Sequence, residues 1–277
     1  MMLDLSASLN PFAPDVPGLA VRHLDALTPY PDDAQATREL ASAMGVDPEL
    51  LVLTNGGAEA IALVADVVSI GDIVEPEFSL YRRHLTQVVD GAGRWRSNPS
   101  NPLGTLAPDE AAAAVWDEAF YPLATGTWTR GDDKAWRLGS LTKLWACAGL
   151  RLGYVIAPDP AAAATVRARC PRWSVNGLAL ALVGELLQLT DLSGWAASVS
   201  SLRADFAHDL RLVGYDVTES RANWVLVNDG DALRSRLASH GIAVRDCSSF
   251  GLDRTVRVAL PHEADVARVV AAFDRCR

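Results

Sequence analysis

Lys143 is the residue of this chain whose type and surroundings point most directly to chemistry. Of the 25 basic residues, only Lys134 and Lys143 are lysines. A lysine amine can lose its proton and act as a nucleophile, whereas an arginine stays charged. Lys143 stands in the glycine-punctuated segment 140–154, with hydroxyl residues three and one positions before it and Arg151 eight positions after it. This pattern indicates Schiff-base chemistry at Lys143, while the setting of Lys134 is typical of a solvated surface charge.

A glycine-containing turn at residues 54–59, with the sequence Thr-Asn-Gly-Gly-Ala-Glu, is the second candidate feature. Asn-Gly pairs often form hairpin turns. The apolar residues of segment 58–68, however, recur with helical spacing, which favours a strand, a glycine loop and a helix in that order. Backbone N–H groups at the start of such a helix bind phosphate well. The segment therefore predicts a phosphate site, with an ordinary strand-to-helix turn as the alternative.

Asp117 completes the set of candidate reactive residues. Two Asn-Pro steps in segment 98–104 predict an extended loop, and sixteen residues after Asn101 comes Asp117, at the end of a short apolar strand. An aspartate there could simply cap a helix. Beside a nucleophilic lysine and a phosphate loop, it is better explained as the partner of a pyridine nitrogen. A carboxylate keeps that nitrogen protonated, and the protonated ring is the electron sink of pyridoxal phosphate.

In the order of these motifs, the chain resembles the fold-type I family of pyridoxal-phosphate enzymes, in the aminotransferase class I/II branch. The resemblance runs from about Leu3 to Phe273 and extends to the threonine-phosphate decarboxylases of cobalamin biosynthesis, with the histidinol-phosphate aminotransferases as neighbours. The segments that carry this narrower similarity are residues 4–11, 30–32, 75–81, 117–120 and 173–176.

The resemblance implies a role for each cofactor-binding residue. Lys143 would form the Schiff base and shuttle the proton, and Asp117 would pair with the ring nitrogen. Phe78 would stack on the pyridine ring, and Asn101 would donate a hydrogen bond to the ring hydroxyl. The cofactor phosphate would be held by Gly57, Ala58, Ser140, Thr142 and Arg151.

Substrate binding and assembly are implied in the same way. Arg257 matches an arginine that grips the substrate α-carboxylate with two hydrogen bonds, and Asn10 and Asn176 would line the substrate pocket. Tyr30 matches a tyrosine that reaches the cofactor phosphate of the other subunit. The resemblance therefore implies a homodimer with shared active sites.

The chain also departs from the family pattern. Phe120 stands where many relatives have a tyrosine that hydrogen-bonds the ring hydroxyl, and Ser8 stands where asparagine is more frequent. The intervals 81–98 and 101–117 are much shorter than in typical relatives. A somewhat shortened large domain is therefore expected, which bears on the rigidity of the site and on the exclusion of water.

The elements that position these residues follow an α/β pattern, in which short apolar runs alternate with alanine-rich helical segments. We expect a three-layer large domain over residues 20–189, and a smaller α+β domain made of residues 1–19 and 190–277. Helices are expected at 58–68 and 265–275. Strands are expected at residues 50–54, 72–75, 114–117, 153–157, 224–227, 242–245 and 256–260.

Composition excludes several classes of function. The net charge of −9 argues against a nucleic-acid partner. The most apolar stretch, 177–184, is halted by Glu185 and is too short to cross a membrane. The cysteines lack metal-ligand spacing and the histidines are scattered, so no metal site is expected. With no visible secretory signal, the chain is expected in the cytoplasm.

The function implied is that of a pyridoxal-phosphate enzyme, a lyase or a transferase, acting on a small phosphorylated amino acid or amine. Decarboxylation of threonine phosphate is the leading reaction. A histidinol-phosphate-type transamination is the first alternative. The second alternative is a protein that binds pyridoxal phosphate without turnover, which the shortened large domain suggests.

Overall fold

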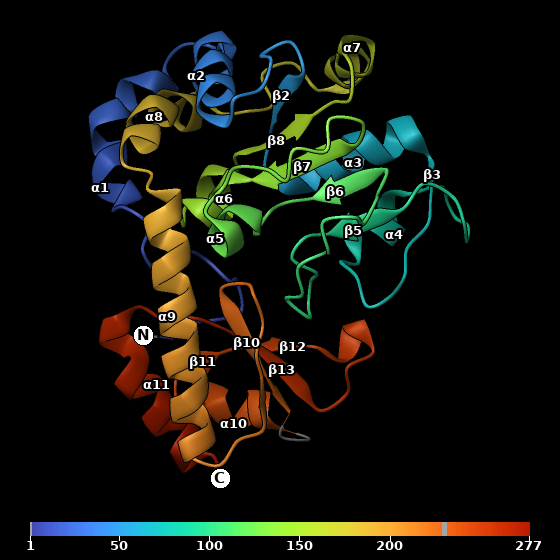
Figure 1. Ribbon diagram of the computed structural model, residues 1–277. Helices are drawn as coiled ribbons and strands as arrows, with labels where there is room; N and C mark the ends of the chain where they lie inside the picture. Colours follow the sequence, from blue (N-terminus) through green and yellow to red (C-terminus); the bar gives the residue numbers. More distant parts are fainter. Residues whose placement is uncertain (1, 229–231) are drawn as a thin grey trace.

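The computed structural model describes residues 2–228 and 232–277, which form two packed units connected by the long helix α9 (Leu192–Leu212) (Figure 1). The large unit is built around a five-stranded sheet in the order β2-β8-β7-β6-β5. Strands β5, β6 and β7 are parallel, and β8 is antiparallel to both of its neighbours. These strands are β2 (Leu51–Thr54), β5 (Trp95–Ser97), β6 (Val115–Asp117), β7 (Trp136–Ser140) and β8 (Gly153–Ile156).

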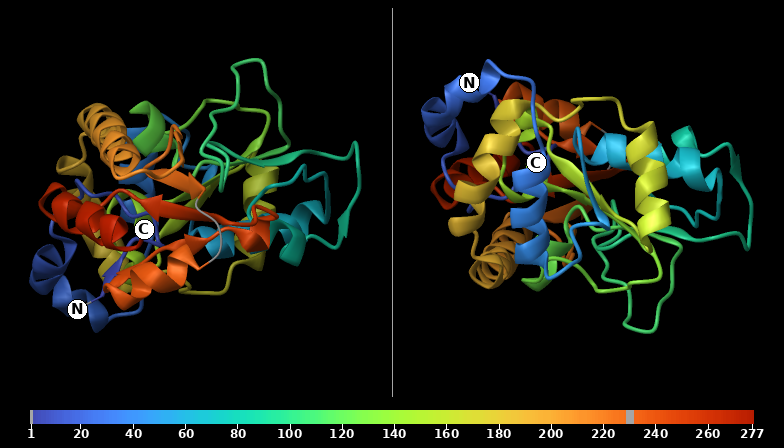
Figure 2. Two further views of the ribbon diagram at one scale, coloured as in Figure 1. Left: turned by 90° about the horizontal axis from the view of Figure 1, so that it is seen from below. Right: turned by 90° about the horizontal axis from the view of Figure 1, so that it is seen from above.

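Helices cover both faces of this sheet, as the view from above shows (Figure 2). Because side chains alternate along a strand, Leu51 and Leu53 of β2 face one core, whereas Val52 faces the other. The first core includes α2 (Ala34–Met44), α5 (Tyr121–Thr125), α6 (Leu141–Leu144) and α8 (Gly177–Gln188). The second includes α3 (Gly57–Val68), α4 (Leu80–His84) and α7 (Pro160–Arg169). The predicted three-layer α/β fold is confirmed.

Short elements complete the large unit. Helices α1 (Val16–Ala20) and η1 (Val21–Leu27) lie beside α8, and β3 (Ile70–Gly71) pairs with β4 (Gln87–Val88). The predicted strand at 72–75 is wrong, because after a single bridge from Asp72 to Arg94 the chain leaves the ladder. Pro76 follows directly, and a proline has no N–H to donate to a strand ladder.

The small unit contains a four-stranded antiparallel sheet in the order β12-β13-β10-β9. Its core is shared by α9, α10 (Leu233–Ser239) and α11 (Glu263–Arg275). The predicted strand at 242–245 is split: β11 (Ile242–Ala243) pairs with the amino-terminal β1 (Leu3–Asp4), while the following residues join the larger sheet. The four strands of that sheet are β9 (Val217–Thr218), β10 (Trp224–Asn228), β12 (Arg245–Asp246) and β13 (Thr255–Ala259).

Helix α9 contributes to the cores of both units. Its first turns place Leu192 and Trp195 in the core of the large unit, whereas Val199 and Phe206 lie in the core of the small unit. The predicted division near residue 190 remains a prediction. Within the described part of the chain, no helix combines the length and apolar character needed to cross a membrane.

Candidate active site

A cavity of about 250 Å³ brings together ten of the thirteen predicted site residues. It lies where strands of the large sheet end and where β13 of the small unit approaches them, and that is the usual position of a ligand in an α/β sheet. The ten residues are Gly57, Ala58, Phe78, Asn101, Asp117, Ser140, Thr142, Lys143, Arg151 and Arg257.

One end of the cavity offers the donors of an anion site. Helix α3 begins at Gly57, and the N–H groups of Gly57 and Ala58 point out of the helix start without an acceptor in the helix. The hydroxyls of Ser140 and Thr142 lie 2.8 Å apart beside it. Arg151 packs so closely that a Cβ on Gly56 would lie 2.3 Å from its guanidinium. The glycine, with φ of +79°, is therefore required for this approach.

Lys143 projects from the short helix α6, and its Nζ donates to the carbonyl of Ala7 at 2.7 Å. Burial lowers the pKa of Lys143 to about 8, and the positive charges of Arg257 and Arg151 contribute to the same shift. The Phe120 ring lies 5.9 Å from Nζ. The amine is thus held in the cavity in a state from which its proton can leave near neutral pH.

Asp117 is partly buried at the end of β6 and is fixed through both carboxyl oxygens. Its Oδ2 accepts from the Tyr81 hydroxyl at 2.7 Å, and its Oδ1 accepts from the N–H of Ala119 at 3.0 Å. Burial raises the pKa of Asp117, while these two hydrogen bonds favour the ionised form. A cationic partner in the cavity would add to this preference for the carboxylate.

Arg257 enters the cavity from β13, and only 7 % of its surface is exposed. It donates to the side chain of Asn101 at 2.5 Å and to the carbonyl of Ser6 at 3.0 Å. Its Nε has no partner, and no ion pair within the described residues involves it. Burial lowers the pKa of Arg257 to about 10. A buried cation without a carboxylate is costly, and an anionic ligand would compensate that cost.

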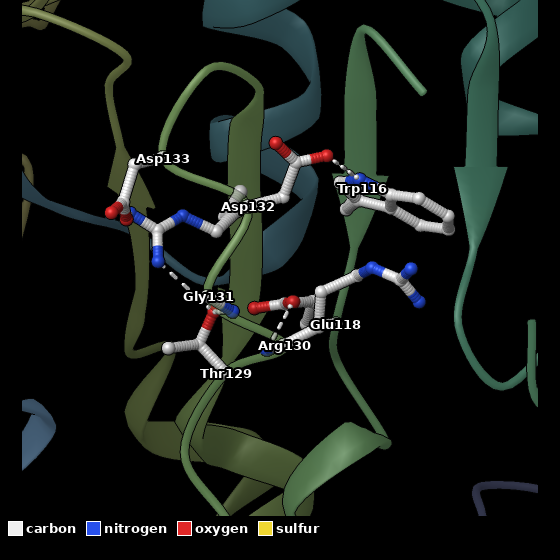
Figure 3. A network of polar contacts seen from close by, with 8 residues as sticks. Trp116, Glu118, Thr129, Arg130, Gly131, Asp132 and Asp133 are labelled. Carbon is white, nitrogen blue, oxygen red and sulfur yellow. Dashed lines mark hydrogen bonds and ion pairs between the residues drawn. The ribbon is translucent and has the colours of Figure 1, made fainter. Parts of the chain in front are cut away.

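A polar network next to β6 secures the strand that carries Asp117 (Figure 3). Glu118 is buried and accepts from the N–H of Arg130 at 2.9 Å. The Arg130 guanidinium lies 4.3 Å from the ring centre of Trp116, whose Nε1 donates to Asp132 at 2.9 Å. Burial raises the pKa of Glu118 to about 7. The network ties the loop before β7 to the strand that ends at Asp117.

Asn10 and Asn176 do not line this cavity. The side-chain amide of Asn10 donates to the carbonyl of Leu144 at 2.9 Å, and its backbone N–H donates to the carbonyl of Lys143. Asn176 caps α8 and donates to the carbonyl of Leu150 at 2.7 Å. In this structure both side chains brace backbone next to the reactive lysine and Arg151. Their role as substrate contacts stays a prediction.

Tyr30 lies outside the cavity. It is 78 % exposed and stacks on Trp173, with ring centres 4.5 Å apart. Further apolar side chains are exposed in the neighbouring helix η1, namely Val21, Leu24 and Leu27. The position of Tyr30 leaves it available to contact another molecule.

Sequence reasoning missed three side chains that organise the cavity. Tyr81 fixes Asp117, and the buried pair of Ser97 and Glu77 supports the loop of Asn101. One signal was present, because Tyr81 follows Phe78 by only three residues. No spacing in the sequence joins Glu77 to Ser97, twenty residues later.

Comparisons with known proteins show which family the chain is similar to. The family model described as aminotransferase class I and II matches residues 95–273. A threonine-phosphate decarboxylase of Salmonella typhimurium is 30 % identical, with 98 % of this chain and 90 % of that protein aligned. A histidinol-phosphate aminotransferase of Mycobacterium bovis is 34 % identical over 77 % of this chain and 63 % of its own length. The crystal structure of the Clostridium acetobutylicum histidinol-phosphate aminotransferase superposes with a TM-score of 0.87 at 23 % identity, covering 99 % of this chain and 98 % of that one.

Proposed function

Because the chain belongs to the aminotransferase class I and II family and is therefore a pyridoxal-phosphate-dependent enzyme, we propose that it decarboxylates a small phosphorylated amino acid. Threonine phosphate is the leading substrate, which would place the reaction in cobalamin biosynthesis. The proposal is supported by the relative aligned along 98 % of the chain, whose name is threonine-phosphate decarboxylase.

The donor set of the cavity fits pyridoxal phosphate. The first-turn N–H groups of Gly57 and Ala58 would bind its phosphate. Two hydroxyls and a guanidinium would complete the phosphate site, which is made of Ser140, Thr142 and Arg151. Phe78 would cover the ring. Asn101 already accepts from Arg257 through Oδ1, so its amide N–H group remains to donate to the ring hydroxyl.

Pyridoxal phosphate, when bound, supplies a protonated pyridine ring that takes up the electron pair released at the substrate Cα. Asp117 would keep the ring nitrogen protonated, and Tyr81 with the Ala119 N–H would hold that carboxylate in place. Lys143 would supply the attaching amine and afterwards hold the proton that is delivered to Cα. With a pKa near 8, its amine can both give up and take a proton near neutrality.

The observation that carries the choice of substrate class is the buried Arg257. It lines the same cavity as Lys143 and has no carboxylate partner among the described residues. Two hydrogen bonds from a guanidinium to an α-carboxylate would fix which bond of the substrate is aligned for cleavage. An amino acid carries that carboxylate throughout a decarboxylation, up to the step in which CO₂ leaves.

Transamination of histidinol phosphate is the second candidate, favoured by the 34 % identity to an enzyme of that name. Histidinol phosphate lacks a carboxylate, so Arg257 would serve only the amino-acid half of that reaction. A protein without turnover is a third reading. The alignment with the Salmonella relative extends over 330 positions, more than the 277 residues of this chain, so internal segments of that relative are missing here.

Measured CO₂ release from threonine phosphate by the pyridoxal-phosphate-loaded protein tests the proposal. Arg257→Ala should lower the rate of release by about 30- to 4000-fold, because loss of a buried charged contact costs about 2–5 kcal/mol. Should the wild type release no CO₂ but transfer the amino group of histidinol phosphate to the cofactor, transamination replaces decarboxylation. In that case Arg257→Ala should accept the amino group normally, yet fail to pass it on to 2-oxoglutarate. If the protein neither releases CO₂ nor transfers an amino group with any substrate, the result favours a protein that binds pyridoxal phosphate without turnover.

The proposal includes a homodimer in the cytoplasm. Tyr30 would reach the cofactor phosphate of the other subunit, which agrees with its 78 % exposure and its position on the surface beside Trp173. The exposed apolar residues of η1 would be covered in the same contact. A dimer interface buries such apolar residues.

A further inference from the structure

A buried carboxyl group outside the cavity holds part of the cavity wall. Glu77 lies in the loop before α4 and is 5 % exposed. Its two carboxyl oxygens accept from the N–H of Ser97 at 3.2 and 3.3 Å, and Oε2 also accepts from the Ser97 hydroxyl. Ser97 ends β5 and lines the cavity, whereas Glu77 borders a separate surface groove.

The hydrogen bonds continue from Ser97 to the substrate-binding arginine. The Ser97 oxygen accepts from the N–H of Asn101 at 2.8 Å, and the Asn101 side chain accepts from Arg257 at 2.5 Å. Because the hydroxyl proton of Ser97 is directed to Glu77, the oxygen lone pairs face Asn101. The chain of bonds therefore runs from Glu77 in the large unit to Arg257 in the small unit.

We propose that Glu77 is a positioning residue that orients Arg257, through Ser97 and Asn101, for the carboxylate of the substrate. The proposal rests on the function proposed above, in which Arg257 binds that carboxylate. Among the residues that the structure describes, the guanidinium has one hydrogen-bond partner besides Asn101, the carbonyl of Ser6. If Ser97 and Glu77 no longer held Asn101 in place, the guanidinium would be free to turn, and a site that is held loosely binds its ligand less well.

The surroundings of Glu77 make this support dependent on pH. Burial raises the pKa of Glu77 to about 7, and nearby Asp117 adds to the shift. Tyr81 of α4 and the cationic Arg96 of β5 also lie close enough to interact with the charge of Glu77. Glu75, which accepts from the Glu77 N–H at 2.7 Å, is paired with Arg82. An ionised carboxylate is the stronger acceptor. The chain of bonds should therefore be firmest above about pH 7.

Binding of two unreactive ligands to the pyridoxal-phosphate-loaded protein tests the proposal by calorimetry. The first, 3-phosphooxybutyrate, is threonine phosphate without its amine, and the second, propan-2-yl phosphate, also lacks the carboxylate. Glu77→Gln should lower the affinity for the first ligand roughly tenfold and leave the affinity for the second unchanged, because only the first ligand needs Arg257. Ser97→Ala should change the two affinities in the same way. The double variant should bind 3-phosphooxybutyrate no more weakly than either single variant does. Glu75→Gln, on the same loop, is the matched control and should bind both ligands normally.

The pH profile separates positioning from a general structural defect. The affinity ratio of wild type to Glu77→Gln for 3-phosphooxybutyrate should rise as pH increases through 7, whereas a structural defect would weaken both ligands alike. Equal losses for the two ligands, or none, overturn the proposal.

A wild type that does not distinguish the ligands refutes the role of Arg257 instead. A crystal structure of Glu77→Gln then decides the positioning claim. A displaced Asn101 supports it, and an unmoved Asn101 and Arg257 overturn it.

Discussion

Lys143 should titrate far below an ordinary lysine, and the size of the effect follows from its surroundings. Burial, followed by the charges of Arg257 and Arg151, lowers its pKa from 10.5 to about 8. At pH 7 this raises the fraction of free amine by a factor of ten to the power of 10.5 minus 8, or about 300. The free amine is the form that attacks an aldehyde. The site would therefore prepare the lysine for its cofactor before the cofactor binds.

Competitive acetylation of the cofactor-free protein between pH 6 and 11 measures this pKa directly. The chain has two lysines, so mass spectrometry resolves both, and the exposed Lys134 is an internal reference. The labelling midpoint of Lys143 should lie near 8. In Arg257→Gln it should move upward, because one positive charge is removed while burial remains. A wild-type midpoint near 10.5, or one that does not respond to Arg257→Gln, refutes the electrostatic reasoning.

Three further predictions concern the carboxylates and the dimer. Asp117→Asn should still bind pyridoxal phosphate, since the phosphate contacts are intact, but should lose several orders of magnitude in turnover; a variant as active as the wild type excludes the role of Asp117. Glu118→Gln should gain stability relative to the wild type as pH rises from 4.5 to 7. The folded protein holds the Glu118 proton more tightly over that window, so ionisation costs the wild type stability on the order of 1–3 kcal/mol. A difference in melting temperature between variant and wild type that is the same at pH 5 and at pH 8 contradicts this. Mixed Lys143→Ala and Tyr30→Ala subunits should regain activity in about a quarter of the sites if dimers share them, whereas no recovery after mixing argues against sharing.

Residues close together in the sequence could be placed in the site from the sequence. The glycine turn before α3 lies between the strand expected at 50–54 and the helix expected at 58–68, so strand and helix periodicity locate it. Asp117 follows from the same logic, because it ends an apolar strand. Lys143 was found by its residue type and by the neighbouring hydroxyl residues, glycines and Arg151, and the strand β7 before it was not predicted. Arg257 is different. It comes from a strand of the other unit, and only the resemblance to a family connected it with Lys143.

Contacts that depend on how separate elements approach each other could not be predicted. Tyr81 meets Asp117 across thirty-six residues, and Ser97 meets Glu77 across twenty. Neither pair is joined by a periodic pattern, because each contact is set by how α4 and its preceding loop pack against the ends of two strands. Asn10 illustrates the same point, since its side chain binds the backbone of α6 instead of entering the cavity.

The connection between β5 and β6 shows how the shortened large unit keeps Asp117 in place. Parallel neighbours are usually joined through a helix that covers the sheet, yet residues 98–114 contain none. The backbone carbonyls of this connection need donors from elsewhere. The Arg130 guanidinium donates to the carbonyls of residues 108, 109 and 111, at 3.2, 2.7 and 3.1 Å. The same guanidinium covers Trp116, the residue before Asp117. One side chain therefore supports part of the helix-free connection and also braces the strand on which the proposed partner of the pyridine nitrogen stands.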